Sequence, residues 1–227
     1  MNIGISIMTI KQSFSLLFFY FIMKGVLFGS LLLFDLNSLG IVLESAINIF
    51  FNISVEYLIL ILIIKKVRKI NPDFKLSNLS INSVNYKLFL TAFIFLVGFF
   101  LLYYFTIGLW INEMAKEPFQ EYFVKLETEF KRNPYPIYGS AFIIAPVFEE
   151  LFFRGVILNE LAKRFQFFKA IIFSSLFFAA SHLSISSFIP TVMFGLIIGF
   201  LYLNGKSLIS CILLHALMNI FMTVIDL

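Results

Sequence analysis

The stretch Phe148-Glu149-Glu150-Leu151-Phe152-Phe153-Arg154 decides the fold, because it places three charged side chains inside a long apolar segment. On insertion scales, each charge at the centre of a transmembrane helix costs about 2.5–3.5 kcal/mol. The apolar residues on both sides argue against a simple interfacial charge cluster at a helix end, which is the structural alternative. The three charges therefore need partners elsewhere in the chain or a function.

The composition indicates a polytopic membrane protein. The chain has 227 residues, of which 60% are hydrophobic and 13% are charged, whereas soluble domains have roughly 45–50% apolar and about 25% charged residues. The net charge of +4 is small and lies mainly in loops, so it predicts membrane topology and no nucleic-acid partner. Cys211 is the single cysteine, which excludes an internal disulfide.

Several apolar segments have the roughly 20 residues that a membrane-spanning helix needs. The sequence predicts an all-α transmembrane bundle of about seven spans in a single domain, residues 1–227. Residues 1–111 form variable N-terminal helices, and residues 137–226 form a catalytic helix core. The predicted spans are Phe14–Phe34, Ile41–Ile64, Leu88–Ile111, Ile137–Leu158, Ala170–Ser187, Pro190–Leu203 and Ser207–Ile225.

Residues 112–136 differ from these spans in composition. They mix acidic and basic residues with Phe119, Phe123, Leu126 and Phe130 at helical spacing. This pattern predicts an amphipathic helix at the membrane interface, ended by the prolines at 134 and 136.

The distribution of Lys and Arg in short loops predicts the orientation. With seven spans, the clusters Lys65–Lys69 and Lys163–Lys169 and the residue Lys206 fall on one side of the membrane. Basic loops face the cytoplasm, so we expect a cytoplasmic N-terminus. The expected location is the bacterial plasma membrane, with the lipid bilayer as a partner; the oligomeric state is left open.

The two adjacent glutamates have different helical neighbours. Glu150 and Arg154 are four residues apart and share a helix face, so they can form an ion pair. Glu149 lies about 100° around the helix and is expected to point elsewhere. A carboxylate in that position is available as a general base. Pro146 interrupts the helical hydrogen bonding just before the pair, as is tolerated in buried or cavity-lining segments.

The only two histidines lie in predicted spans. His182 follows Phe178 by four residues, and His215 precedes Asn219 by four, so each pair shares a helix face. A single histidine in a helix is more often structural than catalytic. Two histidines, an asparagine and a charged triplet at bilayer depth weaken that alternative, since ionisable residues inside a membrane are functional candidates.

The three motifs Glu149-Glu150-x-x-x-Arg154, Phe178-x-x-x-His182 and His215-x-x-x-Asn219 together resemble the signature of the CPBP family. This family comprises the CAAX prenyl endopeptidases and the related bacterial Abi, or bacteriocin-processing, membrane proteins. The resemblance covers residues 138–225. Each motif alone is weak, but three in this order and spacing are specific.

The resemblance implies an intramembrane endopeptidase of the glutamic type, acting on a peptide or membrane-protein substrate. Glu149 and His182 would activate a water molecule. His215 and Asn219 would donate to the developing oxyanion, a role known for preorganised donors. Glu150 and Arg154 would support Glu149, and Phe178 would shape the pocket, with no cofactor expected.

A zinc site is the alternative chemistry. Glu149, His182 and His215 form a ligand set that zinc accepts with one position left open. Against it, no His-Glu-x-x-His motif is present, and the charge of Arg154 would oppose a cation.

Other residues in the same half of the chain have simpler interpretations. Cys211 and His215 are four residues apart and could form a nucleophile pair, although a single apolar cysteine usually packs. Ser181 is adjacent to His182 in the sequence and is expected to face another way. Gly195 and Gly199 form a face of small residues, which predicts close helix packing and not chemistry.

Two other functions stay open for the whole chain. It could be a non-proteolytic bacteriocin immunity or scaffolding protein on the same fold, since a fold alone does not determine function. It could also be a proton-coupled transporter. A transporter predicts a repeat between the two halves, and none is visible in the sequence.

Overall fold

The computed structural model describes residues 41–70, 84–108, 134–182 and 184–226, together with residues 12, 15, 16, 18–20, 22, 72, 128, 131 and 132. All regular elements among these residues are helices, without strands, so the predicted all-α class is confirmed. Three helices are long and apolar enough to cross a membrane, and two shorter apolar helices accompany them. The protein is an integral membrane protein with a helical bundle.

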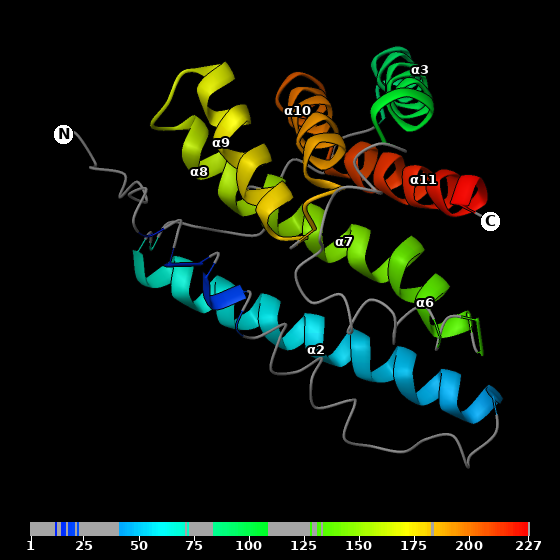
Figure 1. Ribbon diagram of the computed structural model, residues 1–227. Coiled ribbons are helices and arrows are strands. Elements are labelled where there is room, and N and C mark those ends of the chain that lie inside the picture. The colour runs from blue at the N-terminus through cyan, green and yellow to red at the C-terminus, as the bar shows by residue number, and fades with distance from the viewer. Residues whose placement is uncertain are drawn as a thin grey trace.

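A long central helix organises the bundle. It runs from Tyr135 to Ala162 through five consecutive segments, which are α6 (Tyr135–Gly139), η4 (Ser140–Ile144), α7 (Ala145–Glu150), η5 (Leu151–Leu158) and α8 (Asn159–Ala162). On one side of it lies α2 (Ile41–Ile70), which contacts α6, η4 and α7. On the other side lie α3 (Tyr86–Tyr103), α10 (Phe188–Gly205) and α11 (Leu208–Asp226), as Figure 1 shows. The short helix α9 (Phe167–Ala180) runs beside η5 and α10.

Most predicted spans correspond to observed helices with shifted ends. The helix α2 continues through the basic cluster to Ile70, beyond the predicted end at Ile64. The helix α3 continues into the π-helical turn η3 (Tyr104–Gly108). The predicted span 14–34 and the predicted amphipathic helix 112–136 lie mostly outside the described residues.

The segments η4 and η5 are π-helical, so their backbone hydrogen bonds join residues five apart and not four. Pro146 stands in the first turn of α7, directly after η4, where its missing N–H is tolerated. The predicted interruption before the glutamates is therefore present, and it takes the form of a π turn. Such turns are rare in proteins and often occur at functional sites.

Small residues allow α9 and α10 to pack closely, as the sequence predicted for Gly195 and Gly199. A Cβ atom on Gly195 would lie 2.9 Å from the Cβ atom and 3.0 Å from the Cα atom of Ser175. A Cβ on Gly199 would lie 3.1 Å from a methyl group of Ile171. The two backbones are thus held at a distance that larger residues would prevent.

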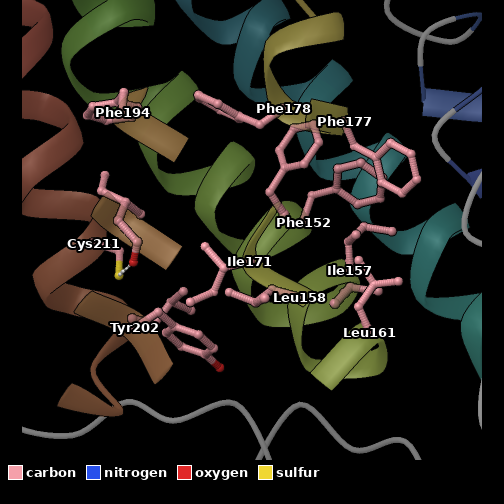
Figure 2. Packing of buried hydrophobic residues seen from close by; sticks show 14 of the residues in the cluster. Phe152, Ile157, Leu158, Leu161, Ile171, Phe177, Phe178, Phe194, Tyr202 and Cys211 are labelled. Atoms are coloured by element: carbon pink, nitrogen blue, oxygen red, sulfur yellow. Dashed lines mark hydrogen bonds between the residues drawn. The ribbon is translucent and has the colours of Figure 1, made fainter. Parts of the chain in front are cut away.

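Aromatic side chains fill the interior between the central helix and its neighbours (Figure 2). Phe153 packs edge-to-face against Phe152, with centroids 4.9 Å apart, and against Phe178, with centroids 5.1 Å apart. Phe178 also contacts Phe194 of α10 at 5.8 Å. This cluster connects η5, α9 and α10 next to the charged residues.

Candidate active site

A buried ion pair lies at the junction of α7 and η5. Nε of Arg154 is 3.0 Å from Oε2 of Glu150, and the two side chains are 1% and 0% exposed. The contact is an ion pair without an aligned N–H···O bond. The predicted i, i+4 pairing of these residues is thus present in the structure.

His215 of α11 lies between the two glutamates. Its Nδ1 is 2.8 Å from Oε1 of Glu150, and its Nε2 is 4.0 Å from Oε2 of Glu149. One imidazole therefore faces both carboxylates, one through each ring nitrogen. This arrangement brings the first and third sequence motifs together.

The sequence expectation that Glu149 turns away from the partners of Glu150 is not met. In a uniform α-helix the two side chains would diverge by about 100°. Here Glu149, which is 13% exposed, and the fully buried Glu150 both approach His215. The helix changes between α and π hydrogen bonding next to them, and a histidine from another helix is long enough to reach both.

Phe178 connects the ion pair to both histidines. The guanidinium carbon of Arg154 lies 4.5 Å from its ring centroid, a distance suited to a cation–π contact. The ring also meets the imidazoles of His182 and His215 edge-to-face, with centroids 4.8 and 5.8 Å apart. All three motifs therefore converge on one buried phenyl ring.

Asn219 connects α11 to the π turn before the glutamates. Its Nδ2 donates to the carbonyl oxygen of Ala141 in η4, over 2.7 Å. A π turn leaves backbone carbonyls without their usual helical partner, and a side-chain amide can satisfy one. Asn219 thus lies one helical turn beyond His215 and holds the segment that precedes Glu149.

The prediction that His182 lies inside a span is wrong. The helix α9 ends at Ala180, and His182 follows in an exposed turn. The cause is local, because two side chains bind the same backbone carbonyl at the helix end. Oγ of Ser181 donates to the carbonyl of Phe178 over 2.6 Å, and Nδ1 of His182 lies 3.0 Å from that oxygen. Such local hydrogen bonds compete with continuation of a helix. Ser181 therefore does not face away from His182 as expected, since its Oγ lies 3.4 Å from Nδ1 of that histidine.

The turn after His182 has an anchor that the sequence did not reveal. The hydroxyl of Tyr103, at the end of α3, donates to the carbonyl of Ser186 over 3.0 Å. Within the turn, the backbone N–H of Ser187 donates to Oγ of Ser184. No residue pattern links positions 83 apart in the chain, so this contact could not have been predicted.

The geometry bears on two alternatives, a zinc site and a cysteine nucleophile. Among the described residues, no group of three or more His, Cys, Asp and Glu side chains is arranged to hold a metal ion. The buried thiol of Cys211 contacts the carbonyls of Ser207 and Ile198, at 3.4 and 3.8 Å. It therefore packs against backbone oxygens, and Figure 2 shows a dashed line from the labelled Cys211 to one such oxygen.

Comparisons with known proteins agree with the resemblance drawn from the three motifs. The family described as type II CAAX prenyl endopeptidase Rce1-like matches residues 131–221. A protein of Bacillus subtilis (strain 168), described as "Putative membrane peptidase YdiL", is 31% identical over 85 residues. That alignment covers 37% of this chain and 35% of the relative. No solved structure matches significantly.

The matched segment contains the complete candidate site. It extends from the beginning of the central helix to α11 and includes all three motifs. The helices α2 and α3 lie outside it. The resemblance to the CAAX endopeptidases that the motifs predicted is therefore confirmed for residues 131–221.

Proposed function

We propose that this protein is a membrane-embedded endopeptidase that hydrolyses a peptide bond with a water molecule activated by Glu149. One observation carries the proposal: the imidazole of His215 faces Glu149 and Glu150 in a buried site at the meeting point of three motif-bearing helices. The matched family and the matched bacterial protein are both named as peptidases, which supports the same reaction class.

In this proposal Glu149 is the general base. It is the more exposed of the two glutamates, 13% against 0%, so it is the one that water can reach. Its carboxylate takes a proton from water as the oxygen attacks the peptide carbonyl, and the proton then passes to the leaving amine. His182, in the exposed turn over Phe178, assists as the second proton-handling group.

Asn219 stabilises the oxyanion that forms on the attacked carbonyl, and His215, which directs Nδ1 at Glu150, offers Nε2 to Glu149 as a proton acceptor. Both are held by contacts that restrict their motion, Nδ1 of His215 by Glu150 and the amide of Asn219 by Ala141. Donors that are already oriented stabilise developing charge without reorganisation. The amide of Asn219 keeps a second N–H for this purpose.

The surroundings of the site support a proposal for the substrate class. Apolar helices surround the glutamates, which supports a substrate that reaches the site from within or beside the membrane. We propose a peptide or membrane-protein substrate, with a prenylated CAAX peptide and a bacteriocin leader peptide as the two chemical types to compare.

The experiment uses purified protein in detergent with both peptide types. Glu149→Gln is expected to abolish cleavage, with a loss of at least about 10³-fold because the water loses its base. His182→Ala is expected to lose a large part of the rate. Glu160→Gln is the control, because Glu160 is also a glutamate of the central helix, is 1% exposed, and pairs with Lys163.

Each outcome separates the alternatives. Wild-type cleavage by the Glu149→Gln variant would remove the catalytic interpretation. Loss of cleavage in a strong chelator, restored by Zn²⁺, would favour a zinc site formed by Glu149, His182 and His215. Retention of an immunity phenotype by catalytically silent variants would favour the non-proteolytic scaffold.

A further inference from the structure

The contacts of His215 specify which ring nitrogen carries its hydrogen. Oε1 of Glu150 lies 2.8 Å from Nδ1, and Glu150 pairs with Arg154 as a carboxylate. A carboxylate accepts hydrogen bonds and has none to donate. The hydrogen must therefore be on Nδ1, and Nε2 is the nitrogen that faces Glu149.

We infer that Glu150 is a positioning residue, which fixes the tautomer and the orientation of His215 and so presents Nε2 to the reacting groups. For its kinetic consequence this inference rests on the proposed peptidase function. The sequence resemblance implied only that Glu150 supports its neighbour Glu149. Here Glu150 orients His215, which lies on a different helix.

The ring is held on its other sides by aromatic side chains. Phe194 and Phe178 meet the imidazole at interplanar angles of 67° and 82°, with centroids 4.9 and 5.8 Å away. Glu150 is held in turn by Arg154, which packs over Phe178. Together these contacts fix the plane of the His215 imidazole and the direction in which its Nδ1 points.

His182 supplies an internal reference. Its Nδ1 lies 3.0 Å from the carbonyl oxygen of Phe178, and a carbonyl oxygen can only accept. His182 is therefore expected to carry its hydrogen on Nδ1 as well, for a reason independent of Glu150. Both histidines of the chain share one tautomer, but only one of them depends on Glu150.

An almost isosteric substitution tests the inference. In Glu150→Gln, the amide oxygen must stay toward Arg154, because a guanidinium has only donors. The amide nitrogen then faces Nδ1 of His215 and requires an acceptor there. The hydrogen of His215 is expected to move to Nε2.

The measurement is nitrogen NMR of protein labelled with ¹⁵N-histidine, recorded with neutral imidazoles. With two histidines, a His182→Gln variant assigns both sets of signals. The wild type is expected to show both rings with the hydrogen on Nδ1. Glu150→Gln is expected to move His215 alone to the Nε2–H form, and Glu160→Gln is expected to move neither.

Kinetics provide the second readout. Because Nε2 would be blocked by its hydrogen, kcat of Glu150→Gln is expected to fall by about 10³- to 10⁴-fold, as when the tautomer-holding carboxylate of a Ser–His–Asp triad becomes an amide. KM is expected to change little, since the substituted side chain is buried.

The results separate this inference from the proposed function. A wild-type His215 with its hydrogen on Nε2, or an unchanged tautomer in Glu150→Gln, would overturn the inference. So would an active Glu150→Gln enzyme in which Glu149→Gln is inactive. If the tautomers are as expected but the wild type cleaves no peptide, the positioning by Glu150 stands and the proposed function fails.

Discussion

Asn219 on the last helix donates a hydrogen bond to the carbonyl oxygen of Ala141, 78 positions earlier in the chain, over 2.7 Å. The acceptor belongs to the π turn η4, so one amide joins α11 to the segment that leads into Glu149. The same side chain is proposed to serve the oxyanion. Structural and catalytic effects of Asn219 must therefore be measured separately.

Replacement of Asn219 is expected to lower stability as well as activity. Asn219→Ala leaves the Ala141 carbonyl without its partner and is expected to cost about 1–3 kcal/mol of unfolding free energy. Asn219→Asp is expected to cost more, because a carboxylate cannot donate to that carbonyl. Thermal unfolding in detergent measures both. Asn204→Ala is the control, since Asn204 makes the same type of bond to Phe200 at an exposed helix end; an equal loss there would contradict the prediction.

Phe178→Leu is expected to destabilise the site. The substitution removes a cation–π contact with Arg154, worth about 2 kcal/mol when desolvated, together with the ring contacts to both histidines. The expected loss is about 2–3 kcal/mol, measured by chemical or thermal unfolding. Phe168→Leu on the same helix is the control, because the Phe168 side chain is 69% exposed. Equal effects of the two substitutions would argue against a special role for Phe178.

Gly195→Ala is expected to disrupt the packing of α9 on α10. The added Cβ would lie 3.0 Å from the Cα of Ser175, and backbone atoms cannot move aside cheaply. We expect a loss of about 1–3 kcal/mol, as for other overpacked sites. Gly98→Ala is the control, because a Cβ added there would have no neighbouring atom within 4 Å. It is expected to be neutral or slightly stabilising, since alanine favours helix.

Tyr103→Phe is expected to loosen the turn that carries His182. The change removes only the hydroxyl that binds the Ser186 carbonyl, a loss of about 1 kcal/mol. Faster amide hydrogen exchange at residues 184–187 is the direct measurement, and reduced kcat is the functional one. Tyr104→Phe, at the adjacent position, is the control. Unchanged exchange in Tyr103→Phe would show that the turn is held by its own serine hydrogen bonds.

Much of the fold could be predicted because membrane helices have strong local signals. Long apolar segments predicted α2, α3, α10 and α11, since about 20 apolar residues cross a bilayer as a helix. The positions of the helix ends were predicted less accurately. Apolar residues near Ile185 extended the predicted fifth span, whereas local hydrogen bonds by Ser181 and His182 end α9 at Ala180.

The candidate site was only partly predictable for a related reason. Spacing of four residues correctly predicted the pairing of Glu150 with Arg154. It could not predict that His215 would reach both glutamates, because that depends on helix packing and on π turns. Neither π segment of the central helix, η4 or η5, has a recognisable residue pattern, and only Pro146 indicated an interruption.

The π turn η4 also has a consequence for helical phase. A π turn is equivalent to an α-helix with one inserted residue, which rotates all later side chains by about 100°. The central helix can therefore pack α6 against α2 and still direct both glutamates toward α11. A single-residue deletion in η4 would return the helix to one continuous phase and turn the carboxylates away from His215, although no residue of the site would be altered.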